Sequence, residues 1–155
     1  MPAFPICRRF SFRLLATGIA AILLMAFATI AAPTARAQTD ADQGAVRSVI
    51  SDQLDAFLAE DAARAYSHAS PGIRQLFPGE ERFMGMVQRD YAPVYRSRSR
   101  EFRDLRQTAL GPVQEVVLIG PNGQEWLALY TMEQQPDGSW KIAGVRLVRQ
   151  EGVAA

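Results

Sequence analysis

The first half of the chain carries apolar residues at helical spacing over residues 40–60. They recur every three or four positions, which is typical of one buried helix face: Val46, Val49, Ile50, Leu54, Phe57 and Leu58. Asp40 precedes this run and Gln43 follows three positions later, a spacing that predicts a capping box at the helix start. We therefore expect a first helix over residues 40–60, with Asp52 and Asp55 on its solvent-facing side.

A break in this pattern follows at the stretch AYSHASPGIRQLF, residues 65–77. Pro71 disfavours helical dihedrals at Ser70, which ends a second helix that begins after Asp61. Ser70 is also a favourable N-cap, and Pro71 is a favourable first residue for a new helical turn. The chain's only histidine, His68, stands beside this break. The stretch is therefore predicted to be a joint between helices rather than an active site.

Beyond the joint, the pattern changes from helix to strand. A third helix is expected from Glu80 onward, with Phe83, Met84 and Val87 buried. From Tyr95 the residues alternate with a period of two, and three further strands are expected at residues 113–119, 124–134 and 139–149. The turn sequences PNG and PDG separate these three strands and favour antiparallel neighbours. The pattern as a whole predicts an α+β fold in which N-terminal helices pack on an antiparallel sheet of about four strands.

Three arginines lie at alternate positions where the strand pattern begins. Arg96, Arg98 and Arg100 would share one face of an extended segment. One interpretation is a site for an anion or an acidic partner. The other is a solvated edge strand whose charges prevent aggregation, and the chain's sixteen arginines against one lysine favour it.

The expected strands are apolar on both faces. The strand over residues 124–134 has Trp126, Ala128, Tyr130 and Met132 on one side and Leu127 and Leu129 on the other. A sheet with one wet face alternates more cleanly between apolar and polar residues. The outer face is therefore predicted to meet a second copy in a homodimer, or to be covered by the C-terminal residues.

The N-terminus has the pattern of a cleavable signal peptide. Three arginines near the start form a positive front, and residues 14–32 follow without a charge. Ala35-Arg36-Ala37 then supplies the small-x-small pattern that signal peptidase reads. We expect residues 1–37 to be removed after Ala37, which leaves a single periplasmic or secreted domain over residues 38–155. The alternative is a retained membrane anchor, because the run of 19 apolar residues nearly spans a bilayer.

Removal of this segment changes the charge and the cysteine content. The whole chain has 17 basic and 16 acidic residues, and cleavage takes away four arginines, which leaves a formal net charge of −3. Nucleic acid is not the expected partner of such a surface. The only cysteine, Cys7, lies inside the segment. The remaining domain would hold no disulfide and no cysteine-ligated metal.

Gln53 is the exception on the apolar face of the first helix. At 100° per residue it falls in the middle of that face. A buried amide either bonds a neighbouring backbone group or looks into a cavity, and both alternatives remain open. If a cavity exists, Gln53 is its expected polar anchor, with Tyr66, Trp126 and Tyr130 as aromatic walls. The alternative is that these three aromatic residues belong to the core.

Three stretches of the chain resemble a known family. They are QLDAFLAEDAARAYSHASPGIRQLF, FMGMVQRDYAPVYR and NGQEWLALYTMEQQPDGSWKIAGVRLV. Together they resemble an uncharacterised family of bacterial exported proteins, a domain of unknown function within the NTF2-like (nuclear transport factor 2-like) superfamily. The closing pattern D-G-x-W-x-I-x-G, residues 137–144, is similar to that of many NTF2-like domains. The resemblance implies a curved sheet wrapped around helices, with a conical pocket between them.

The resemblance does not transfer catalytic residues, because no motif here matches those of the NTF2-like enzymes. The leading hypothesis is an exported domain that binds a small apolar ligand or an envelope protein without catalysis, cofactor or metal. One alternative is a small pocket enzyme of isomerase, dehydratase or hydrolase type, using a carboxylate or His68. It needs an inward-facing titratable group with a perturbed pKa. The other alternative is a membrane-anchored envelope scaffold.

Overall fold

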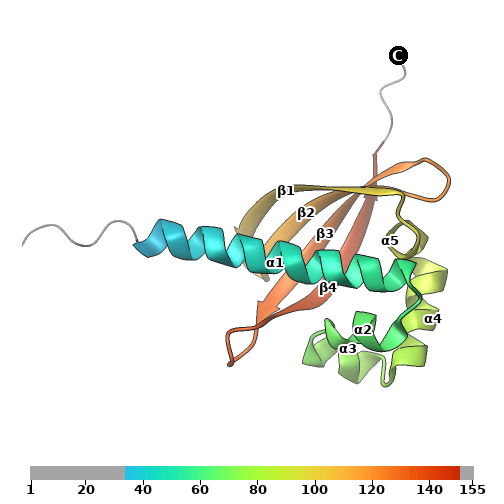
Figure 1. Cartoon of the computed structure of the whole chain (residues 1–155), viewed down its shortest axis with the longest axis horizontal. Coiled ribbons are helices and arrows are strands. Elements are labelled where there is room, and N and C mark those ends of the chain that lie inside the picture. Colours follow the sequence, from blue (N-terminus) through green and yellow to red (C-terminus); the bar gives the residue numbers. More distant parts are fainter. Residues whose placement is uncertain (1–33, 151–155) are drawn as a thin grey trace, which may run out of the picture. The chain divides into compact units, whose positions relative to one another are not determined.

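The computed structural model describes residues 34–150, and the side chains from residue 42 onward. Most of the predicted signal peptide, residues 1–33, lies outside the described residues. Helices precede strands along the chain (Figure 1). The elements are α1 (Thr34–Leu58), α2 (Ala62–Ser67), α3 (Pro71–Leu76), α4 (Glu80–Asp90), α5 (Ala92–Tyr95), β1 (Ser99–Thr108), β2 (Gly111–Ile119), β3 (Glu125–Gln134) and β4 (Trp140–Arg149). None of the described helices combines the length and the apolarity that a membrane span requires.

The four strands form one open antiparallel sheet in the order β1-β2-β3-β4. This meander confirms the predicted α+β class and the number of strands. Gly123 and Gly138 have φ values of 81° and 82° at the two predicted turns. Glycine adopts this left-handed conformation without the steric penalty of a Cβ atom. The turn sequences therefore set the register of β2, β3 and β4.

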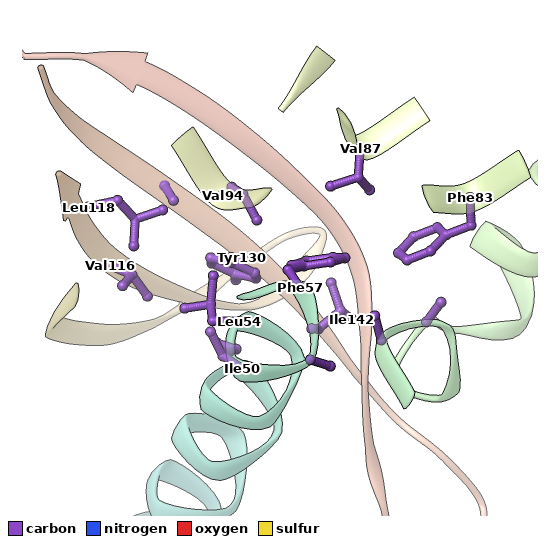
Figure 2. Close-up of a cluster of buried hydrophobic side chains, with 14 of the residues drawn as sticks. Ile50, Leu54, Phe57, Phe83, Val87, Val94, Val116, Leu118, Tyr130 and Ile142 are labelled. Atoms are coloured by element: carbon purple, nitrogen blue, oxygen red, sulfur yellow. The ribbon is translucent and has the colours of Figure 1, made fainter. Parts of the chain in front are cut away.

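The core lies between α1 and one face of the sheet. Ile50, Leu54 and Phe57 of α1 are buried, as their helical spacing predicted. They pack in one cluster with Val116 of β2 and Tyr130 of β3, as Figure 2 shows. Alternate residues of the strands face this cluster, because side chains along a strand point to opposite faces. The helix-facing side of the sheet is thereby separated from an outer side of half-exposed residues.

Two boundaries differ from the sequence-based expectation. Asp40 is not a helix cap, because α1 begins at Thr34 and runs through it. Residues 34–38 contain good helix formers and neither glycine nor proline, so nothing in them ends the helix. The first strand begins at Ser99 rather than Tyr95. Tyr95 instead ends the short helix α5, which has a proline in its first turn.

Candidate functional site

The joint between α2 and α3 is bonded along its backbone to the sheet. Ala69 forms a parallel bridge with Ile142 of β4. The Ser70 amide donates to Ile142 O at 2.9 Å, and the Ile142 amide donates to His68 O at 2.9 Å. Residues 68–70 thus extend the sheet beyond β4. This arrangement confirms that the stretch is a joint, and it fixes the joint against the last strand.

Ser70 caps α3, as its position before Pro71 predicted. Its Oγ accepts from the Ile73 amide at 3.4 Å, and its side chain is buried. Ser67 is also occupied, because its Oγ donates to Arg64 O at 2.7 Å. Neither serine hydroxyl is therefore activated by His68.

His68 is held by a carboxylate that the sequence analysis placed on a solvated face. Its Nε2 lies 2.5 Å from Asp52 Oδ2 on α1. Arg64 of α2 also pairs with Asp52, and its Nε donates to Oδ2 at 3.1 Å. Hydrogen bonds from Arg64, and then from His68, lower the pKa of Asp52 from 3.8 to about 2. The cluster ties α1 to the joint. The contact was missed because Asp52 and His68 are 16 positions apart and only the turn after α1 brings them together.

An apolar pocket of about 350 Å³ borders the joint. Its walls come from α1, the joint, α3, α4, α5 and β4. The lining residues are Gln53, Phe57, Ala69, Ile73, Phe77, Phe83, Met86, Val87, Asp90, Tyr91, Val94, Ile142, Gly144 and Val145. Several of them gather around Phe57 in Figure 2. A pocket of this size and composition suits a small apolar molecule.

Aromatic rings stiffen one wall of this pocket. The Phe57 and Phe83 ring centroids are 6.1 Å apart with an interplanar angle of 27°. Phe83 also packs against Tyr66, with the two centroids 5.5 Å apart. Such pairs contribute about 0.5–1.5 kcal/mol beyond the area that they bury. The wall is therefore held by contacts that do not depend on a ligand.

Gln53 is the buried polar residue of the pocket lining, with 3% of its surface exposed. Its Nε2 donates to Ala65 O at 3.2 Å. Both predicted alternatives therefore hold for Gln53, because its amide bonds a neighbouring backbone carbonyl and its side chain also lines a cavity. The bond uses the amide nitrogen, and among the described residues no hydrogen bond to the amide oxygen is found.

The other three predicted pocket residues are not among those that line it. Tyr66 stands behind Phe83, with its OH donating to Phe77 O at 3.1 Å. Trp126 and Tyr130 lie on the helix-facing side of β3. Burial raises the pKa of Tyr130 above its ordinary value, and among the described residues its OH has no hydrogen-bond partner. A role for these three in ligand binding stays a prediction.

Residues of α3, α4 and α5 supply much of the lining that sequence reasoning missed. Phe77, Met86 and Tyr91 are among these residues. Their apolar character does not show whether they line a pocket or fill the core. The available signal was the pair of breaks at Pro71 and Pro78, which limits α3 to a short helix.

Chemistry in the pocket is limited by its titratable groups. Asp90 is the one carboxylate in the lining, and its side chain is exposed. An enzyme of the isomerase type would need a desolvated acid or base facing the substrate. Within residues 42–150 no group of three histidine, cysteine or acidic side chains is arranged to hold a metal ion.

The three alternate arginines do not share a strand face. Arg96 follows α5 and pairs with Glu60, whereas Arg100 lies in β1 and pairs with Asp55 of α1 at 2.6 Å. The predicted shared face fails because the strand starts only at Ser99. Arg100 thus neutralises an acid on α1 and Arg96 neutralises one in the turn after α1, and the two do not form an anion site.

A comparison with known protein families assigns the chain to one of them. Residues 39–155 match DUF4864, a domain of unknown function, and the chain belongs to this family. We found no match among functionally curated proteins or among solved structures.

Proposed function

We propose that this protein is an exported binding domain of the NTF2-like type, which holds a small apolar ligand in the pocket around Gln53. The observation that carries the proposal is the 350 Å³ pocket, lined by phenylalanine, methionine and aliphatic residues with one buried amide. Sparse polar groups in an apolar recess are typical of ligand sites. The order of helices and a four-stranded antiparallel sheet supports the NTF2-like assignment.

The ligand class follows from the lining. Apolar side chains favour a hydrocarbon or aromatic body, and the Gln53 oxygen favours one hydrogen-bond donor on it. A site built around a polar contact discriminates against an analogue that lacks the partner group. We therefore expect the pocket to prefer an aromatic alcohol to the corresponding hydrocarbon.

A fluorescence titration with the uncharged dye N-phenyl-1-naphthylamine tests the pocket. We expect saturable enhancement with one site per chain. Ile73→Trp should fill the pocket and weaken binding at least about tenfold, the equivalent of about 1.4 kcal/mol. Leu76→Trp is the matched control, because Leu76 lies on the same helix and is 73% exposed. Equal weakening by both variants, or the absence of saturation, would contradict the proposal.

Competition between 1-naphthol and naphthalene for the dye tests the role of Gln53. The wild-type chain should prefer 1-naphthol, and Gln53→Leu should remove that preference while keeping naphthalene binding. An unchanged preference in the variant would show that the amide does not contact the ligand.

Export from the cytoplasm is the second part of the proposal, and it is supported by the pattern of residues 1–37. Expression of the whole chain in a bacterial host should yield a periplasmic product that begins at Gln38. Intact mass measurement of the purified protein gives the answer. A product that keeps residues 1–37 and sediments with membranes would favour the anchored scaffold.

A homodimer through the outer sheet face completes the proposal. Half-exposed apolar residues occupy alternate positions of β2, β3 and β4 on that face, namely Val113, Val117, Leu127, Leu129 and Val148. Such a patch favours burial against a second copy. Sedimentation velocity should show a dimer that Leu129→Arg converts to a monomer, and a monomeric wild-type chain would contradict this part.

A further inference from the structure

A second recess lies at the joint, beside the turn between β3 and β4. It is an open groove of about 650 Å³, and its lining is more polar than that of the first pocket. Its lining residues are Ala69, Pro71, Arg74, Gln75, Gln135, Pro136, Asp137, Ser139 and Lys141. Two cations thus face one groove, and one of them is the chain's single lysine.

The two cations converge on a single backbone oxygen. Arg74 Nη2 donates to Ser67 O at 2.8 Å, and Lys141 Nζ donates to the same oxygen at 2.9 Å. Like charges in such proximity repel each other, and this arrangement has a cost unless an anion lies nearby. The charges are therefore held together by a shared neutral acceptor.

Neutral groups orient these cations without neutralising them. Arg74 Nε donates to Ala69 O at 3.0 Å, and its guanidinium stacks over the Tyr66 ring at 5.1 Å. Among residues 42–150 no carboxylate forms a salt bridge with either cation, unlike Arg64, Arg96 and Arg100. A guanidinium has five N–H donors and an ammonium has three, so most of their donors stay available. The pair is preorganised for an external acceptor, which lowers the entropic cost of binding.

The charge of the groove selects among anions. Asp137 is its one carboxylate, and its Oδ1 accepts from the Ser139 amide at 2.9 Å and from Ser139 Oγ at 2.6 Å. Those hydrogen bonds lower the pKa of Asp137, and the charge of Lys141 adds to the effect. Two cations and one carboxylate leave one positive charge in excess. A singly charged oxyanion balances it, whereas a doubly charged phosphate would leave a negative charge in excess and be repelled more strongly by Asp137.

We propose that this groove is a binding site for the carboxylate of a small organic acid, held between Arg74 and Lys141. The site is separate from the apolar pocket, and it does not depend on the function proposed for that pocket. Arg74 provides the planar donor pair that matches a carboxylate, and Lys141 provides a point charge beside it. Gln75 and Gln135 border the groove and can bond polar groups on the rest of the acid.

The single lysine makes the site directly observable. Incorporation of lysine labelled with ¹³C at Cε labels Lys141 alone, keeps its charge and all three N–H donors, and gives one side-chain NMR signal. Sodium acetate is the probe, sodium chloride at equal ionic strength is the control, and sodium phosphate tests the charge preference. We expect acetate to shift the Lys141 signal saturably with half-saturation in the millimolar range. Chloride should produce only a small linear drift.

Variants separate a built site from general screening. Gln75→Glu adds a carboxylate to the groove without removing any bond of the two cations, and it should weaken acetate binding at least about fivefold, or about 1 kcal/mol. Gln107→Glu makes the same charge change on an exposed position of β1 and should leave acetate binding unchanged. Arg74→Gln should abolish saturation in a chain whose amide spectrum stays folded.

Three outcomes would overturn the proposal. They are an acetate response equal to that of chloride, equal weakening by the two glutamate variants, and tighter binding of phosphate than of acetate. The last would assign the groove to a doubly charged anion in place of a carboxylate. Dye binding in the apolar pocket is measured separately, so failure at one site leaves the other unaffected.

Discussion

The apolar pocket and the cationic groove both border the joint, yet only the groove has cationic side chains in its lining. Ala69 borders both. Ile73 of α3 lines the pocket and its neighbour Arg74 lines the groove. In β4, Ile142 and Lys141 divide in the same way. Consecutive residues on a strand point to opposite faces, and those on a helix are about 100° apart. Two chemically different recesses can therefore be built from adjacent residues of the same short elements.

The largest expected difference concerns stability, because the pocket wall is part of the core and the groove wall is surface. Phe57 is 1% exposed and packs against Phe83, so Phe57→Ala should lower the free energy of unfolding by about 3–5 kcal/mol. Gln75→Ala in the groove should change it by less than about 0.5 kcal/mol. Urea unfolding followed by circular dichroism measures both. Similar effects of the two changes would erase the distinction between the recesses.

A smaller effect is expected from the pocket's buried amide. Gln53→Leu removes the 3.2 Å bond to Ala65 O, which keeps only the longer bond of 3.4 Å from the His68 amide. A buried carbonyl that loses a donor costs about 1–3 kcal/mol. Chemical unfolding of the variant gives the value. An unchanged stability would mean that the amide is retained for ligand contact alone.

The cluster of Asp52, Arg64 and His68, which ties α1 to the joint, should contribute less to stability in acid. The pKa of Asp52 is about 2, below its ordinary 3.8. Its contribution to stability is therefore complete above about pH 4 and is lost as the pH falls toward 2. The Asp52 side chain is 37% exposed, so the contribution is below about 1 kcal/mol. Unfolding curves of the wild-type chain and Asp52→Asn should differ above pH 4 and converge near pH 2. Parallel curves over this range would contradict a role for the ionised carboxylate.

The smallest expected effect sharpens the contrast between the two recesses. Asp137→Asn removes the groove's carboxylate while the new amide oxygen can still accept from Ser139. Acetate affinity at Lys141 should rise roughly two- to fivefold, which is the range expected for a solvent-screened charge. Binding of the naphthyl dye in the pocket should not change. A fall in acetate affinity would indicate that Asp137 orients Lys141.

The fold was largely predictable because its signals are local. The caps, prolines and glycine turns specified the joint at Ser70-Pro71, the start of α4 at Glu80 and the last three strands to within about two residues. The start of α1 was not predictable from the Asp40 spacing, since upstream residues of high helix propensity continue the helix. Capping residues alone do not decide between two possible helix starts when the residues between them also favour a helix.

The sites were less predictable because they depend on long-range packing. Gln53 was identifiable, since a polar residue on an apolar helix face demands an explanation. The remaining pocket wall was not, because apolar residues of α3 to α5 look alike whether they fill a core or leave a gap. Arg74 and Lys141 are 67 positions apart, and only the pairing of the joint with β4 brings them together. Contacts between residues so far apart leave no periodic pattern in the sequence from which they could be predicted.

The bridge between Ala69 and Ile142 also bears on the order in which the chain can fold. The joint between α2 and α3 finds its backbone partner in β4, the last of the described strands along the chain. Contacts between residues so far apart in sequence form late, after the entropy of closing a long loop has been lost. A nascent chain that stops short of Trp140 should therefore stay open and sensitive to proteases, and the addition of β4 would complete the sheet in one cooperative step.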